Sequence, residues 1–488
     1  MKRAILMASM LLLPRLLVAQ ELDLDGLLGQ DWYGLYFNGK KAGYLAAALE
    51  KDAAGNIVSR ENGSFRINMV GVPQEMEFHV ERVYAPEGDL KSIVYDVSDT
   101  HIEAQVQGDK MTLVTTVAGQ TQAEEVPKPA ESLADAVEHA QWVKGKPVQG
   151  DTMEFIEYDP LNRTEITGRS EIMGMEERVL DGVMTQVYRI KTHFDVMNLT
   201  KISFVAQDGT TLEDVVSGVL TMRLEPEEVA KDVNYSNDTI VSNAALIDAP
   251  IEDARTRPLL RLALRGPVGE VHRFNDARQT MRQTGQGYVL FESKLRSAVD
   301  VRSATLPVTD PELLQWAKPT VLIQSDNERI IAKAHEIVGD ETDPLRMANL
   351  LCAWVHDNMR TTFSARLSNS LEVLTSLEGD CTEHSILFIG LARALGIPAR
   401  EVGGLIYVGT TPGFYYHQWA KVWVGEWIDV DPTFNQPLVD VTHIKLVEGD
   451  QLQMAKLIPI IGKLEVEVLP DAPAPGAEEV GQPATNAL

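Results

Sequence analysis

The chain has 488 residues, a length typical of roughly two to four domains. Its 44 lysines and arginines and 71 aspartates and glutamates give a formal net charge of −27, which argues against nucleic acid and anionic membranes as partners. With 44% hydrophobic and 24% charged residues, the composition excludes a wholly disordered chain. Its two cysteines exclude a disulfide framework and a cysteine-rich zinc module.

The first twenty residues have the order of an export signal. Lys2 and Arg3 precede an apolar run over residues 4–13, and the small residue Ala19 precedes an acidic stretch. The apolar run is too short to span a bilayer, which takes about twenty residues. We therefore predict a cleaved signal peptide over residues 1–20 and a periplasmic or secreted protein, with an uncleaved anchor as the alternative.

Residues 21–225 have a β-rich pattern. Apolar and polar side chains alternate on both sides of Asn38-Gly39, a dipeptide typical of a tight β-hairpin turn. This region holds no cluster of His, Cys and Asp with catalytic spacing. We expect one or two antiparallel sheet modules that serve as a scaffold or a substrate platform. Further alternation is seen at residues 65–70, 76–83, 110–117, 187–193 and 202–206.

Residues 226–309 are predicted to be a connecting segment with β-strands. After it the apolar spacing becomes helical. Ser325 and Glu328 have the spacing of a capping box for a helix that Gly339 ends, and Asp343 with the following proline opens a second helix.

Cys381 occupies the start of a nearly wholly apolar helix. It follows Asp380, which is placed to cap the helix, and the helical pattern runs through residues 385–395 to Gly396. Unpaired backbone N–H groups and the helix dipole at this end favour an anion, so we expect a lowered thiol pKa and a nucleophilic thiolate. The alternative is a buried structural cysteine.

A second hairpin is predicted to bring a base and a carboxylate together. His417 and Trp419 share one face of a strand, and the chain turns at Gly425 and returns through Asp431. This folding sets Asp431 opposite Trp419 and diagonal to His417, about 7–8 Å away at the backbone and within side-chain reach. With Cys381, the pair would form an activated thiol, in which the histidine moves the proton and the aspartate fixes its tautomer.

The segments GDCTEHSILFIGLARALGIPAR, YYHQWAKVWVGEWIDVDPTFNQ and DVTHIKL, in this order, closely resemble the bacterial transglutaminase-like family. The resemblance extends over residues 310–465 and is strongest at residues 377–447.

Cys381 matches the position of the family's nucleophile, His417 that of its base and Asp431 that of the third member of its catalytic triad. The resemblance implies a papain-like α+β domain and acyl transfer through a thioester that an amine or water resolves. It also requires an oxyanion hole, to which the Cys381 N–H is a natural donor. A second donor is expected near residues 358–363.

Several neighbours of the triad have more than one interpretation. Trp419 and Trp427 are expected to wall the cleft and shield the His–Asp pair from water. His384, three residues after the nucleophile, either tunes the thiolate or, as we favour, packs against the backbone. Cys381, His384 and His417 could instead ligate zinc, but the pairing with Asp431 favours the triad. We predict no metal and no cofactor. We also expect Cys352 to be a buried core residue.

The predicted fold class is α+β, with antiparallel sheets followed by the papain-like domain. The predicted function is an exported cysteine acyltransferase or amidase that attacks a protein or peptide carboxamide and needs no nucleic acid or small-molecule cofactor. A cysteine protease, or a non-catalytic binding or assembly module of the cell envelope with an unused triad, is the alternative. The spacing of the triad residues does not distinguish acyl transfer to an amine from hydrolysis by water. The sequence also does not give the oligomeric state. The predicted divisions are residues 1–20, 21–225, 226–309, 310–465 and a disordered Pro/Ala-rich tail at 466–488.

Overall fold

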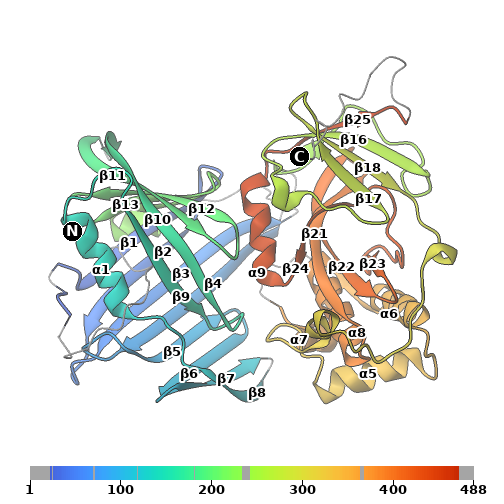
Figure 1. The fold of residues 1–488 in the computed structure, drawn as a ribbon, viewed down its shortest axis with the longest axis horizontal. Coiled ribbons are helices and arrows are strands. Elements are labelled where there is room, and N and C mark those ends of the chain that lie inside the picture. The colour runs from blue at the N-terminus through green and yellow to red at the C-terminus, as the bar shows by residue number, and fades with distance from the viewer. Residues whose placement is uncertain are drawn as a thin grey trace, which may run out of the picture.

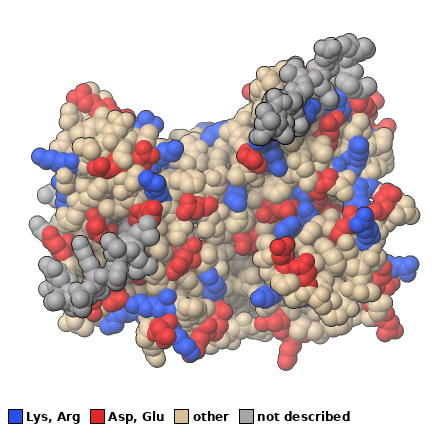
Figure 2. Space-filling model, in the orientation of Figure 1, with Lys and Arg blue, Asp and Glu red and all other residues tan. Residues whose placement is uncertain are grey.

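The chain folds into two lobes, with a notch between their upper ends (Figures 1 and 2). This computed structural model describes residues 22–24, 26–69, 72–117, 119–180, 182–233, 242–362 and 368–471. The predicted signal peptide and most of the predicted tail lie outside these ranges. Within them, no helix combines the length and the apolar character needed to cross a membrane.

The N-terminal lobe is built on a single 14-stranded antiparallel sheet rather than on separate modules. Its strands follow one another in space except where β1 pairs with β14, so the two halves of the sheet are joined in the middle. In chain order the strands are β1 (Gly29–Phe37), β2 (Lys40–Lys51), β3 (Ile57–Met69), β4 (Val72–Tyr84), β5 (Leu90–Val97), β6 (Thr100–Gln107), β7 (Lys110–Val117), β8 (Gln120–Pro127), β9 (Thr152–Asp159), β10 (Thr164–Leu180), β11 (Val183–Phe194), β12 (Leu199–Ala206), β13 (Thr211–Val216) and β14 (Leu220–Leu224).

The sheet curls so that its two ends approach each other (Figure 1). Arg163, in the turn between β9 and β10, donates to Thr115 on β7 over 2.6 Å and also pairs with Glu124 on β8. Helix α1 (Leu133–Lys144), which the sequence analysis missed, packs its apolar face into the lobe's core. The predicted hairpin turn is confirmed, because Asn38 and Gly39 have φ values of 47° and 76°.

The C-terminal lobe centres on a five-stranded sheet that carries the predicted hairpin. The strand order is β15-β22-β21-β24, and β23 also pairs with β22. The bounds are β15 (Ala245–Leu246), β21 (Ala399–Val408), β22 (Gly413–Trp423), β23 (Trp427–Val430) and β24 (Ile444–Gly449).

Helices cover one face of this sheet, with α8 directly against it (Figure 1). Side chains of α8 such as Leu387 and Phe388 are fully buried in the core that the helices share with the sheet. The main helices are α5 (Glu328–Val338), α6 (Pro344–Asn358), α7 (Ser370–Ser376) and α8 (Cys381–Ala394). Shorter elements are α2 (Glu227–Ala230), α4 (Pro311–Leu314), α9 (Gln451–Met454), the 3-10 helices η1 (Glu270–His272), η2 (Ala298–Asp300), η3 (Gln315–Ala317) and η4 (Ala455–Ile460), and a small parallel pair, β19 (Arg360–Thr361) and β20 (Glu378–Gly379).

The helix boundaries match the sequence predictions except for one cap. Asn327, not Ser325, caps α5, because its side chain accepts the Arg329 N–H over 3.0 Å. Gly339 ends that helix with a φ of 56°. Asp343 caps α6 as predicted.

The segment predicted as a connection contributes a sheet of its own. The strands β16 (Leu259–Arg265), β17 (Gln279–Gln283) and β18 (Val289–Lys294) pair in the order β17-β18-β16-β25. The last strand, β25 (Glu465–Leu469), lies in the region predicted to be a disordered tail, so that prediction is wrong at this point. Val466 supplies the physical reason, because it is buried in the core between this sheet and the five-stranded sheet.

Candidate active site

The first turn of α8 presents Cys381 at a capped helix N-terminus. Asp380 accepts the Thr382 N–H over 2.8 Å, and Glu383 accepts the Asp380 N–H over 2.8 Å, which completes a capping box. Gly379 has a φ of 155°, and a Cβ there would lie 2.2 Å from the Glu383 Cβ. Only glycine fits this approach. The predicted capping role of Asp380 is thus confirmed.

The expected low thiol pKa of Cys381 is wrong for this state of the protein. Desolvation raises the pKa of Cys381 well above its usual value, and the negative charge of Asp380 adds to the rise. A hydrogen bond from the Gln418 backbone acts in the opposite direction and is outweighed. Cys381 as a whole residue is nevertheless only partly buried. The resting site therefore holds a thiol that must lose its proton before it can attack.

The hairpin of β22 and β23 brings His417 and Asp431 together. Lys421 pairs with Asp429 and Ala420 with Val430, so the predicted register holds up to the end of the ladder. His417 Nε2 lies 2.9 Å from Asp431 Oδ2, with side-chain exposures of 6% and 0%. His417 holds the pKa of Asp431 far below its usual range despite its burial. Because Nε2 is occupied, Nδ1 is the nitrogen left for a nucleophile.

Ser385 connects the nucleophile's turn to the histidine's strand. Its hydroxyl lies 2.7 Å from the Cys381 carbonyl oxygen and 3.2 Å from the Gln418 carbonyl oxygen. Gln418 directly follows His417, and its backbone also bonds to Cys381. These contacts bring the start of α8 to the part of β22 that carries His417.

The sequence analysis left a second histidine, His443, without a role. Its Nε2 lies 3.0 Å from the same Asp431 oxygen, and its Nδ1 lies 3.3 Å from Asp440 Oδ1. Arg255 donates to the other Asp440 oxygen over 2.6 Å. The signal available in the sequence was Asp440 three residues before His443, just ahead of a strand. The structure makes His443 part of the buried group around Asp431.

Trp419 lies at the His–Asp pair, as expected. Its fully buried ring stacks on His417 with centroids 6.1 Å apart. Phe434, whose centroid is 5.3 Å from that of His417, was not predicted. His384 Nδ1 donates to the Asp380 carbonyl oxygen over 2.6 Å, which is the backbone-bonded role that we favoured.

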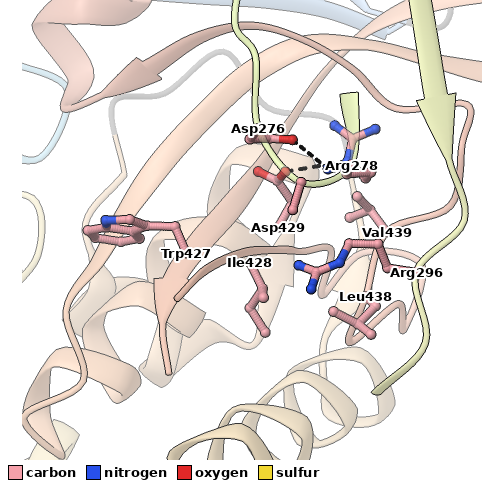
Figure 3. Close-up of a pocket in the computed structure, with 9 residues that line it drawn as sticks. Asp276, Arg278, Arg296, Trp427, Ile428, Asp429, Leu438 and Val439 are labelled. Carbon is pink, nitrogen blue, oxygen red and sulfur yellow. Dashed lines mark hydrogen bonds and ion pairs between the residues drawn. The ribbon is translucent and has the colours of Figure 1, made fainter. Parts of the chain in front are cut away.

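The structure does not bring Trp427 into this group. Its ring lies against the Arg400 guanidinium at 4.3 Å and, with Asp276, Arg278 and Asp429, lines a small pocket of about 10 Å³. In Figure 3 Trp427 projects away from Asp276 and Asp429, which both point toward Arg278. Cys352 is a free, fully buried cysteine of the core, as predicted.

A buried ionic network lies behind the hairpin. Lys445 is fully buried, with its ammonium 2.5 Å from Asp276 and 3.5 Å from Asp429. Arg278 lies 3.5 Å from Asp429 and donates to the His443 carbonyl oxygen over 2.6 Å. Trp419 Nε1 donates to Asp429 over 3.4 Å. The network therefore joins β17 to the strands that hold the site.

His417, Asp431 and His443 also have the composition of a metal site, since one ligand atom from each lies within 4.8 Å of the others. The residues that come together are thus not Cys381, His384 and His417, the zinc ligands that the sequence analysis considered. Both Nε2 atoms lie at hydrogen-bond distance from one Asp431 oxygen, so proton sharing accounts for the arrangement.

Comparisons with known proteins agree with this site. Residues 331–432, which contain all three predicted triad members, match the family model described as the transglutaminase-like superfamily. An uncharacterized protein of Haemophilus influenzae is 33% identical over 131 residues, 24% of this chain and 34% of that protein. The chain thus spans about a third of the length of the curated relatives it matches.

Two solved structures each resemble part of the chain. One, described as a candidate cysteine protease from Cytophaga hutchinsonii, is 15% identical with a TM-score of 0.30, over 46% of this chain and 90% of that one. The other, a β-barrel-like protein of unknown function from Brucella abortus, is 8% identical with a TM-score of 0.31, over 40% of this chain and 94% of that one. On the family match over residues 331–432 alone, the lobe that carries Cys381, His417 and Asp431 contains a transglutaminase-like domain.

Proposed function

We propose that the protein is an exported cysteine enzyme that performs acyl transfer on a carboxamide or peptide carbonyl of a protein or peptide substrate. One observation carries the proposal: a buried Asp431 occupies His417 Nε2 at 2.9 Å, on the strand that Ser385 ties to the turn of Cys381. A histidine oriented in this way has Nδ1 free to take a thiol proton.

The reaction begins with proton transfer from the Cys381 thiol to His417 Nδ1. The thiolate attacks the carbonyl carbon, and the tetrahedral intermediate collapses as the imidazolium gives its proton to the departing amine or ammonia. The product of this half-reaction is a thioester on Cys381. An amine or water, deprotonated by His417, then attacks the thioester, and the thiol leaves with the returned proton.

The oxyanion needs hydrogen-bond donors in the same place. The first N–H groups of a helix have no partner within it, so the Cys381 N–H is available as one donor. The segment expected to supply the second donor is only partly within the described residues, and its donor is not assigned.

Transfer and hydrolysis are separated by a product test. The wild-type protein is incubated with casein and a fluorescent primary alkylamine. Fluorescence on casein identifies transfer, and new peptides identify hydrolysis. Cys381→Ala is expected to abolish either product while its circular dichroism spectrum is unchanged. Product formation by that variant would overturn the proposal.

One observation favours the alternative of a binding or assembly module with an unused triad. The raised pKa of Cys381 leaves the thiol protonated near neutral pH. Alkylation of Cys381 that increases only at alkaline pH, and that does not change in His417→Ala, would support the alternative. Labelling that falls in the His417→Ala variant supports the enzyme.

Export rests on the sequence of residues 1–20. Recovery of the protein from the periplasm or medium with a new N-terminus near residue 20 supports it. A protein that keeps Met1 would contradict cleavage.

A further inference from the structure

The concave face of the 14-stranded sheet holds an open cavity of about 630 Å³. Strands β1 to β4 and β11 to β14 supply its wall, and Val143 near the end of α1 contributes to it. Ligand pockets in proteins have volumes of about 300–1,000 Å³. The cavity is therefore large enough for a small-molecule ligand, and none of the predicted triad residues lines it.

Short side chains keep the cavity open. Ala47, Ser59 and Ser203 all line it. Ala47 pairs across the ladder with Glu61, and Ser59 pairs with Leu49, so Ala47 and Ser59 are diagonal neighbours on adjacent strands. Because strand neighbours on one face share a wall, such positions leave room that larger residues would fill.

The wall is mostly apolar and incompletely covered. Phe37, Leu45, Phe65, Phe194 and Leu220 line the cavity and each remains partly exposed. Burying apolar surface stabilises by about 25 cal/mol per Å², so an apolar chain that covered these side chains would bind favourably. A contiguous apolar surface of this kind marks a binding site.

One oxygen atom in the wall, Oδ1 of Asp214, accepts no hydrogen bond. The side chain of Asp214 is 8% exposed, and its Oδ2 lies 3.1 Å from the Lys201 ammonium. Its Oδ1 is buried and accepts no hydrogen bond. Leaving a buried acceptor unsatisfied costs stability. A ligand that donates a hydrogen bond at this place would remove that cost.

The charged side chains in the wall determine which polar head group a ligand can have. Among the residues that line the cavity, Asp214 and Glu61 supply two carboxyl groups and Lys201 the single ammonium. Burial raises the pKa of Glu61. An anionic head would meet an excess of acidic groups, so an uncharged donor such as a hydroxyl or an aromatic amine fits better.

One end of the cavity faces the catalytic lobe. Ile458, in η4 just after α9, lines it, and Figure 1 shows α9 between the two lobes. Two contacts fix this end: Lys463 donates to the Ser217 carbonyl oxygen over 2.9 Å, and Asn38 donates to Asn243 over 2.9 Å.

We propose that this cavity binds an amphiphile with one long apolar chain and an uncharged, hydrogen-bond-donating head, and that the head donates to Asp214. This site is separate from Cys381 and does not depend on the chemistry proposed there.

The site is tested with 1-N-phenylnaphthylamine, an uncharged apolar amine that fluoresces when it leaves water. The full chain is expected to bind it saturably with one molecule per chain. Ala47→Trp, which fills the cavity, is expected to lose at least about tenfold in affinity. Val179→Trp adds the same ring at a position that is 62% exposed and outside the cavity, and it is expected to bind normally. Equal binding by both folded variants, or no binding by the wild type, would overturn the proposal.

The head is tested by displacing the probe with 1-dodecanol and with its methyl ether, which lacks the donor. The alcohol is expected to displace the probe about tenfold better than the ether does. In the double variant Lys201→Met/Asp214→Leu, which replaces the ion pair by apolar side chains, this preference is expected to disappear. Equal displacement of the wild-type complex by alcohol and ether would contradict the head assignment. Displacement by an apolar peptide and not by dodecanol would make the occupant a protein segment and overturn the proposal.

Discussion

Asp431 accepts from two histidines at once, which gives the site a property beyond a simple triad. Both ring nitrogens of His443 face carboxylates, Asp431 and Asp440, so both are donors and the ring carries a charge. These hydrogen bonds raise the pKa of His443 despite its complete burial. The imidazolium lies 6.1 Å from the His417 ring, centroid to centroid. Its charge compensates that of the buried Asp431.

His443→Gln is predicted to destabilise the protein by about 3–5 kcal/mol, because it leaves two buried carboxylates with one fewer cation. A raised folded pKa means that the stability from His443 is fully present below its unfolded pKa of about 6.5 and is lost as the pH rises through the folded pKa. The decrease in the free energy of unfolding caused by His443→Gln should therefore be largest at acidic pH and smaller at alkaline pH. Urea unfolding from pH 5.5 to 9.5 measures this, with His335→Gln on the exposed side of α5 as control. A pH-independent loss would contradict the charge assigned to His443.

Asp380→Asn is predicted to speed alkylation of Cys381. Burial, followed by the charge of Glu383, raises the pKa of Asp380 to about 8. Above that pH its carboxylate opposes the thiolate, whereas asparagine keeps an oxygen for the cap without the charge. Iodoacetamide labelling rates of the two proteins should therefore differ little at pH 7 and clearly at pH 9. The same ratio at both pH values would show that Asp380 does not act through its charge.

At the scale of elements, the position of Cys381 depends on how tightly the chain enters α8. Gly379→Ala is predicted to cost at least about 3 kcal/mol, because its φ of 155° is strained for alanine and its Cβ would lie 2.2 Å from Glu383. The helix start must shift, and a displacement of about 1 Å lowers turnover roughly a hundredfold. The readouts are thermal unfolding and turnover.

Gly396→Ala is the matched control for that variant. Gly396 follows the other end of α8 with a φ of 77° and has no atom within 4 Å of a built Cβ. It should lose about 1–2 kcal/mol and keep its turnover. Equal loss of turnover in both variants would contradict the role of Gly379 at the site.

Elements whose signals are local were predictable from the sequence. The hairpin at Asn38-Gly39 and the register that brings Asp431 to His417 both follow from turn chemistry and alternation. Helix α1 was missed although its buried positions Leu133, Ala136, Val137 and Ala140 have helical spacing and Ser132 caps its start, so the signal for it was local. The strand β25 was missed because its partner, β16, lies some two hundred residues earlier in the chain.

At the scale of the whole molecule, the features that could not be predicted depend on contacts between residues far apart in the sequence. Nothing local indicates that β1 pairs with β14 and makes one sheet of fourteen strands. His443 was missed for the same reason, because its partner Asp431 meets it only in the fold. Figure 2 shows acidic and basic side chains interspersed over the visible face, so the negative net charge forms no single patch there.

The buried ionic network around Lys445 is predicted to hold together the sheet of β16, β17, β18 and β25 and the five-stranded sheet that carries His417. Lys445→Met should cost about 3–5 kcal/mol, because Asp276, Asp429 and Glu448 then lose a cation that is completely buried. Lys333→Met removes a half-exposed pair on α5 and should cost less than about 1 kcal/mol. Urea unfolding followed by tryptophan fluorescence compares the two variants. Similar losses would show that the network does not join the sheets.

The most direct test of the central claim is the intact mass of the protein after brief incubation with p-nitrophenyl acetate, an acyl donor that needs no knowledge of the natural substrate. The account predicts one acetyl group on Cys381, removed by hydroxylamine as a thioester would be, absent from Cys381→Ala and much reduced in His417→Ala. Peptide mapping locates the adduct. Acetylation elsewhere, or equal labelling of Cys381 without His417, would contradict a working Cys381–His417–Asp431 triad.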